Sequence, residues 1–150
     1  MAIASAGVPV ALREIWLRER PVAFLALSPS GTVPCLSTEI TALDESLDIM
    51  TWALGQNDPT RLLQMRMAGH ALISDNDKPF KLALDRVKYA SQLSVAIPAQ
   101  DRANAAVFLL RLEGQLTAPF LFRAQPTLAV MAILRFVRQF SFVDKNWFNE

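Results

Sequence analysis

The sequence predicts an α+β, mostly helical protein that begins with a small α/β unit, residues 1–55, and continues with an all-helical unit, residues 56–150. In residues 8–54, short apolar runs alternate with turn-forming residues. After residue 59, helix formers dominate and apolar residues recur at helical spacing. Between the two, the polar stretch Gln56-Asn57-Asp58-Pro59 ends in a proline and is typical of a boundary between domains.

Composition limits the kinds of partner and compartment. The 150 residues are 52% hydrophobic and 19% charged, a balance that favours a folded core over disorder. A formal net charge of +1 argues against a nucleic-acid partner, which needs a concentrated basic face. The apolar stretches Ala103–Leu110 and Leu128–Leu134 are much shorter than the roughly 20 residues that span a bilayer, so we expect no membrane partner. A single cysteine favours a reducing, cytoplasmic location.

The first unit is expected to contain strands and helices in alternation. We expect a strand at Val8–Ile15, where apolar and β-branched residues gather. Pro21 suits the first turn of a short helix at Val22–Leu27. Turn formers fill Ser28–Thr32. The remaining elements are two short strands and one helix, expected at Cys35–Ser37, at Ile40–Leu43 and from Ser46 to a stop at Gly55.

The second unit is expected to hold four helices. Asp77-Lys78-Pro79 is typical of a helix start and predicts that the second helix begins near Phe80. Asp101 is expected to cap the third helix. Apolar residues cover most sides of this helix and leave only a narrow polar face. The four expected helices are Arg61–Ala71, Phe80–Leu93, Asp101–Leu116 and Thr127–Phe140.

Several motifs in this order resemble the glutathione transferase superfamily, in particular a bacterial branch of it. Ser28-Pro29-Ser30-Gly31-Thr32-Val33-Pro34 resembles the loop that leads into the family's cis-proline. Asp44-Glu45-Ser46-Leu47-Asp48-Ile49-Met50 resembles the family's acidic-Ser helix start. Thr127-Leu128-Ala129 resembles most of the capping element of the family's late helix. The resemblance implies a thioredoxin-like first domain at 1–55 and a helical second domain at 56–150.

The resemblance also implies a glutathione site made by Val33, Pro34, Glu45 and Ser46. A cis bond before Pro34 exposes the backbone groups of Val33, which in the family pair with the cysteinyl part of glutathione. The start of a helix offers unpaired N–H groups and a favourable dipole. The family's pattern implies that Ser46 receives the γ-glutamyl carboxylate and Glu45 the ammonium group.

Three departures from the family pattern accompany this site. The segment Met1–Val10 resembles the end of the family's first helix and the beginning of its second strand. The family's first strand and most of its first helix, about 15–25 residues, therefore have no counterpart in this sequence. No residue here matches the family's catalytic Ser, Tyr or Cys. Val130 stands where the capping element has Asp, and Arg123 stands where the family commonly has a glycine. This pattern is that of a truncated member with absent or very low transferase activity.

Simpler interpretations of the same residues stay open. Asp-x-Ser before an apolar helix is also an ordinary N-cap, and Val-Pro is also an ordinary turn. Cys35 is read as a small strand residue and not as a redox thiol. The lone His70 lacks partners at ligand spacing, so no metal is expected. A homodimer is compatible with the resemblance, and a non-catalytic protein-interaction module is the alternative function.

Overall fold

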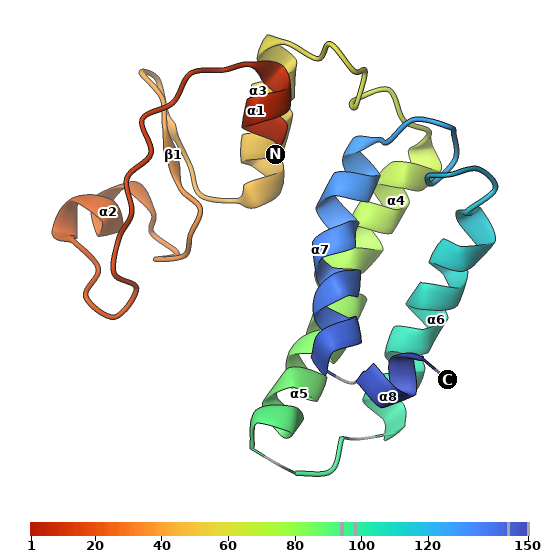
Figure 1. Ribbon diagram of the computed structural model, residues 1–150. Coiled ribbons are helices and arrows are strands. Elements are labelled where there is room, and N and C mark those ends of the chain that lie inside the picture. The colour runs from red at the N-terminus through yellow and green to blue at the C-terminus, as the bar shows by residue number, and fades with distance from the viewer. Residues whose placement is uncertain (94, 98, 144, 150) are drawn as a thin grey trace. The chain divides into compact units, whose positions relative to one another are not determined.

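The computed structural model describes residues 1–93, 95–97, 99–143 and 145–149 (Figure 1). It divides into two compact units, Met1–Leu63 and Gln64–Glu150, and each is described by itself. The first unit is α/β and the second is helical, as the sequence predicts. The assignment of 1–55 and 56–150 as separate domains stays a prediction.

In the first unit, two helices from opposite ends of the segment pack together. Helix α1 (Ala2–Ala6) stops at Gly7, whose φ of 67° is a left-handed conformation that glycine adopts without a steric penalty. Helix α3 (Ser46–Gln56) buries Ile49, Ala53 and Leu54, and it packs against α1. The Asn57 side-chain amide donates to the Ala6 carbonyl oxygen at 3.0 Å, which ties the end of α3 to the end of α1.

The strand expected at Val8–Ile15 is absent. These residues run as extended chain without a strand partner, from the end of α1 toward α2 (Val22–Leu27). A β-strand exists only where its backbone groups pair with a neighbouring strand. The one sheet among the described residues is the hairpin of β1 (Leu36–Ser37) and β2 (Ala42–Leu43), so the apolar pattern of 8–15 finds no partner there.

The hairpin itself follows the sequence prediction, with shorter strands. Leu36 pairs with Leu43 and Ser37 with Ala42 in antiparallel register. The turn is closed by Thr38, whose backbone N–H and hydroxyl both donate to the Thr41 carbonyl oxygen at 2.8 Å. This side-chain bond fixes the turn without glycine.

The sequence predicts that Gly55 ends α3, but the helix does not end there. The helix continues through Gly55 to Gln56, and its C-cap is Asn57 in an extended conformation. A C-terminal glycine stop requires a left-handed residue, and Gly55 has no positive φ. Gly55 is exposed in the last turn of α3, and a Cβ built on it meets no atom within 4 Å.

The first two helices expected in the second unit are one continuous helical run. Helix α4 (Met67–Asp75), the π-helical turn η1 (Asn76–Phe80) and α5 (Lys81–Gln92) follow one another without a break. Pro79 lies inside η1 and does not start a new helix. The wider π turn accommodates a residue that lacks an N–H and would interrupt a regular α-helix. The run begins later than expected, and Arg61 lies outside it with a φ of 56°.

Two long helices complete the second unit. Helix α6 (Ala99–Gln115) packs mainly against α5 and η1, and α7 (Leu128–Val143) packs against α4 and α5. Phe80 of η1 contacts Phe108 of α6 at 4.6 Å and Phe140 of α7 at 5.8 Å between ring centroids. A short helix α8 (Lys145–Phe148) adds Trp147 to this aromatic core, 5.5 Å from Phe140. These offset and edge contacts hold the helices together.

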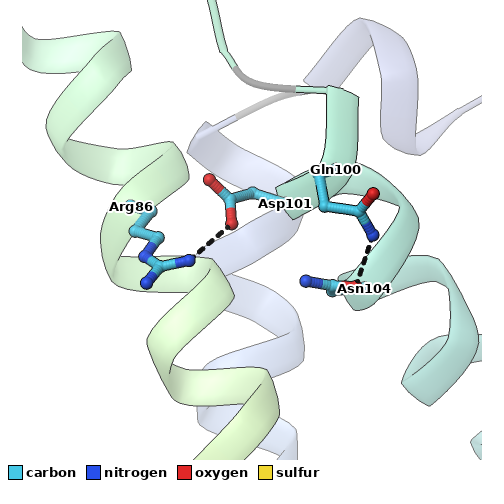
Figure 2. Close-up of polar contacts among 4 residues, drawn as sticks. All are labelled: Arg86, Gln100, Asp101 and Asn104. Atoms are coloured by element: carbon cyan, nitrogen blue, oxygen red, sulfur yellow. Dashed lines mark hydrogen bonds and ion pairs between the residues drawn. The ribbon is translucent and has the colours of Figure 1, made fainter.

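Asp101 has a different role from the expected N-cap. It lies in the first turn of α6, is only 5% exposed, and forms an ion pair with Arg86 of α5 at 3.3 Å (Figure 2). In the same first turn of α6, the Gln100 side-chain amide donates to the Asn104 side-chain oxygen at 3.0 Å. The helix starts at Ala99, two residues before Asp101, so the carboxylate binds a neighbouring helix in place of its own backbone.

Arg123 stands where the family commonly has a glycine, but its φ is not positive. The residue with a left-handed conformation before α7 is Phe122. Phe122 has a φ of 70°, a conformation that costs a bulky residue about 1–2 kcal/mol. Arg123 instead donates from Nε to the Gln125 carbonyl at 3.1 Å and from Nη2 to the Pro126 carbonyl at 2.7 Å. The arginine therefore supports the loop that leads into α7 and adds no backbone strain of its own.

Candidate functional site

The loop before Val33 is held by a network of short polar side chains. Ser28 is fully buried, and its hydroxyl donates to the Thr32 carbonyl oxygen at 3.2 Å. The Gly31 N–H donates to the Ser28 carbonyl at 2.9 Å, and the hydroxyls of Ser30 and Thr32 lie 2.7 Å apart. Ser, Thr and Gly at these positions therefore fold the loop locally, as turn formers do.

Gly31 is favoured in this loop by its backbone conformation. Its φ is 63°, a left-handed conformation that other residues adopt at a cost. A Cβ at this position would also lie 2.9 Å from a guanidinium nitrogen of Arg20, a side-chain end that can move aside. The conformation of Gly31 and the hydrogen bonds within the loop therefore fix the backbone that leads to Val33.

Val33 and Pro34 lie at the exit of this loop. The peptide bond between them is cis, as the sequence resemblance implies. The Val33 side chain is 48% exposed and Pro34 is exposed as well. Strand β1 begins two residues later, so the Val33 backbone lies just beyond the paired part of the hairpin.

The two predicted motifs flank the open end of the hairpin. Leu36 at the start of β1 pairs with Leu43 at the end of β2. Pro34 precedes β1 by two residues, and Glu45 follows β2 by two residues. The chain therefore enters and leaves the hairpin at the end where Val33, Pro34, Glu45 and Ser46 lie in the sequence.

Glu45 and Ser46 form the start of α3. Glu45 is the N-cap, with extended φ and ψ of −102° and 131°, and its carbonyl accepts the Ile49 N–H at 3.0 Å. The Glu45 side chain makes no capping hydrogen bond, and it is exposed. Ser46 is half-buried and is the first helical residue, so its N–H belongs to the first turn of α3. An exposed carboxylate and a helix N-terminus therefore stand side by side.

The lone cysteine next to this site is not activated. Burial raises the pKa of the Cys35 thiol, and the nearby Asp44 carboxylate raises it further. A raised pKa disfavours the thiolate, which is the reactive form. This agrees with the interpretation of Cys35 as a strand-region residue without redox chemistry.

The described part of the chain contains no metal-ligand cluster and no membrane-spanning helix. His70 is exposed on α4, and no group of three or more His, Cys, Asp or Glu side chains gathers there as a metal site would require. No helix within the described ranges has the length and apolar character needed to cross a bilayer. These observations add no second candidate site.

A pocket that the sequence did not predict lies in the second unit. Its volume is about 390 Å³, and it is lined by Gln64, Met65, Arg66, Phe122 and Arg123. The positive φ of Phe122 shapes one part of its wall, and Arg123 is engaged with the carbonyls of the loop before α7. No sequence motif marks these residues, because they come from a coil before α4 and a loop before α7.

Comparison with known proteins agrees with this architecture. Residues 1–61 match the family model of the glutathione S-transferase N-terminal domain. The fold is similar to that of glutathione transferase Omega 3C from Trametes versicolor, with a TM-score of 0.79 and 18% identity over 99% of this chain and 69% of that one. A search of curated protein sequences gave no match.

Two further solved structures show the same likeness. BphK, a bacterial glutathione transferase solved as a ternary complex, has a TM-score of 0.73 and 16% identity, over 95% of this chain and 76% of that one. A delta-class glutathione transferase from Nilaparvata lugens has a TM-score of 0.70 and 18% identity, over 97% of this chain and 80% of that one.

The family model and the fold comparison cover different parts of the chain. The model identifies the first 61 residues by sequence, and the fold extends the likeness across the helical unit. Residues 1–61 thus match the glutathione S-transferase N-terminal domain, and the chain as a whole shares the fold of solved glutathione transferases.

Proposed function

We propose that this chain binds glutathione at the open end of the β1–β2 hairpin. The observation that supports the proposal is the hairpin, whose paired residues Leu36 and Leu43 lie between the two motifs and bring both motifs to its open end. The ligand is suggested by the match of residues 1–61 to the glutathione S-transferase N-terminal domain.

Each residue has a stated role in this proposal. The Val33 backbone N–H and carbonyl pair with the cysteinyl part of glutathione, in the manner of an added strand. The cis bond to Pro34 is the local geometry that presents them. The first-turn N–H groups of α3 and the Ser46 hydroxyl receive the γ-glutamyl carboxylate, because a helix N-terminus favours an anion. The Glu45 carboxylate receives the ammonium group.

We further propose that the 150-residue chain has absent or very low transferase activity. Transfer requires a side chain that stabilises the thiolate of glutathione beside the electrophile. The one thiol near the described site is Cys35, whose pKa is raised, and neither Val33 nor Glu45 stabilises a thiolate. The chain would then hold the tripeptide without activating it.

Calorimetric titration of the chain with glutathione tests the binding part. Saturable binding is expected, and Ser46→Ala should weaken it about tenfold or more because a hydrogen bond to a charged group is lost. Thr51→Ala, an exposed change further along α3, is the matched control and should leave the affinity unchanged. Binding that is absent, or equally weakened by both variants, would contradict the proposed site.

Conjugation of glutathione to an electrophilic aromatic substrate tests the activity part separately. We expect rates equal to the uncatalysed reaction even at saturating glutathione. Rates well above it would overturn the prediction of low activity, while the binding result would stand.

An oligomerisation module is the second candidate function. Several large apolar side chains of the described helices are exposed, among them Val107 and Leu110 of α6 and Phe142 of α7. Such side chains are typical of surfaces that contact another protein. Either function is compatible with the cytoplasmic location that the single cysteine favours.

A further inference from the structure

The pocket in the second unit is formed by two segments that are far apart in the sequence. One is the coil at residues 64–66, which leads directly into α4, and the other is residues 122–123 of the loop between α6 and α7. Figure 1 shows this loop passing the start of α4. The volume of about 390 Å³ lies near the small end of the range for ligand pockets, about 300–1,000 Å³, so the pocket suits a small molecule.

The lining of the pocket carries two arginines. None of its five described lining residues is acidic, and Arg66 forms no ion pair with a carboxylate of the described residues. Arg66 is exposed, so its guanidinium is accessible to a ligand that enters from solvent. The Arg123 guanidinium is held in place because it donates to the carbonyl oxygens of Gln125 and Pro126. Since guanidinium groups bind carboxylates through paired, charge-assisted hydrogen bonds, this lining favours an anionic ligand.

The rest of the lining includes two large apolar side chains. Met65 is half-buried and lies against the first turn of α4, because a Cβ built on Gly69 would lie 3.1 Å from the Met65 Sδ. Phe122 is also half-buried and has a φ of 70°, a conformation that a bulky residue rarely adopts. Its backbone N–H donates to the Gln115 carbonyl at the end of α6 at 3.3 Å, which anchors the loop. Such costly conformations are common where a protein holds a ligand.

We propose that this pocket binds a small aromatic carboxylate. The Arg66 guanidinium pairs with the carboxylate, and Arg123 adds a second positive charge to the same lining. The aromatic ring of the ligand packs against Met65 and Phe122, through sulfur–aromatic and ring–ring contacts. A ligand of this size is expected to bind with a Kd on the order of 0.1–1 mM. The proposal is independent of glutathione binding, because it uses no residue of the hairpin site.

Titration of the ¹⁵N-labelled chain with 2-naphthoate, followed by amide chemical shifts, tests the pocket. Saturable shifts are expected at Met65, Arg66 and Phe122. The uncharged analogue 2-naphthamide has the same rings and should bind about fivefold or more weakly, because the charge-assisted contact with Arg66 is lost. Shifts that do not saturate, shifts confined to residues outside the two pocket segments, or equal affinities for the two compounds would overturn the proposal.

Two variants separate the contribution of the charge from that of the ring. Arg66→Gln should weaken 2-naphthoate binding about fivefold or more and leave 2-naphthamide binding unchanged. Arg138→Gln, the same change at an exposed arginine of α7 outside the pocket, is the matched control and should leave both affinities unchanged. Phe122→Asn removes the ring but keeps a residue that tolerates a positive φ, so it should weaken both compounds alike. Equal losses in Arg66→Gln and Arg138→Gln, or full affinity in Phe122→Asn, would contradict the proposed site.

Discussion

At the scale of single residues, Cys35 shows how environment decides chemistry. It follows the cis-proline directly, next to the proposed glutathione site. Burial and the Asp44 carboxylate nevertheless raise its pKa, so the neutral thiol is favoured. Proximity to the site therefore does not make it a nucleophile.

We predict that Cys35 reacts slowly with iodoacetamide near pH 8. A raised pKa lowers the thiolate fraction at any given pH, so the reaction rate in the folded chain should lie below that of the same chain in denaturant and should rise with pH above the ordinary thiol range. Asp44→Asn should increase the rate in the folded chain, because it removes a negative charge that opposes ionisation. A folded-state rate equal to or above the denatured-state rate would contradict this account.

Thr127 is a second residue whose environment is unusual. It precedes α7, and its carbonyl accepts the Met131 N–H at 3.3 Å, as an N-cap carbonyl does. Its hydroxyl is buried and makes no hydrogen bond with any described residue. The position three residues on, where a capping box has an acidic side chain, holds Val130.

We predict that Val130→Asp stabilises the chain relative to Val130→Ala. The carboxylate can accept the Thr127 backbone N–H and interacts favourably with the helix dipole, an effect of about 0.5–2 kcal/mol. Alanine is the proper reference, because both changes remove the partly buried valine. Chemical denaturation of the two variants measures the difference, and an Asp variant no more stable than the Ala variant would show that α7 needs no such cap.

At the scale of elements, the clearest difference from the sequence prediction concerns where helices end. Gly55 and Asp77-Lys78-Pro79 both carry local signals that favour a helix boundary, yet α3 passes through the first and η1 contains the second. Packing of Ala53 and Leu54 and of Phe80 holds the backbone helical on both sides of these signals. Tertiary contacts outweigh local preferences of about 1 kcal/mol at Gly55.

We predict opposite effects of alanine at two glycines. Gly55→Ala should raise the free energy of unfolding by about 0.5–1 kcal/mol, because the position is helical and a Cβ has open space. Gly31→Ala should lower it, since that residue has a positive φ and a Cβ would meet Arg20. Thermal unfolding of both variants is the measurement, and destabilisation by Gly55→Ala would restore the interpretation of Gly55 as a helix stop.

The elements that the sequence predicts well are those with their own periodic pattern. The expected helices 101–116 and 127–140 lie within a few residues of α6 and α7, because their apolar spacing alone identifies a buried face. The segment Val8–Ile15 has an equally apolar pattern but is not a strand. Strand formation depends on a neighbour elsewhere in the chain, which no local pattern reveals.

At the scale of the whole molecule, the order of an α/β unit before a helical unit is what the sequence predicts and what the glutathione transferase fold shares. Two sequence motifs predict the site residues, and the hairpin, which the motifs flank, has its open end between them. The pocket near Phe122 escapes prediction, because it depends on the conformation of a loop and on residues distant in sequence.

The central proposal is that glutathione binds at the open end of the hairpin, between the segments that contain Val33 and Ser46. Titration of ¹⁵N-labelled protein with glutathione, followed by amide chemical shifts, tests it most directly. The account predicts that the largest shifts fall on Val33, Cys35, Ser46 and Leu47, and that Glu45→Gln reduces the affinity. Saturable shifts confined to the helical unit, or no shifts at millimolar glutathione, would contradict it.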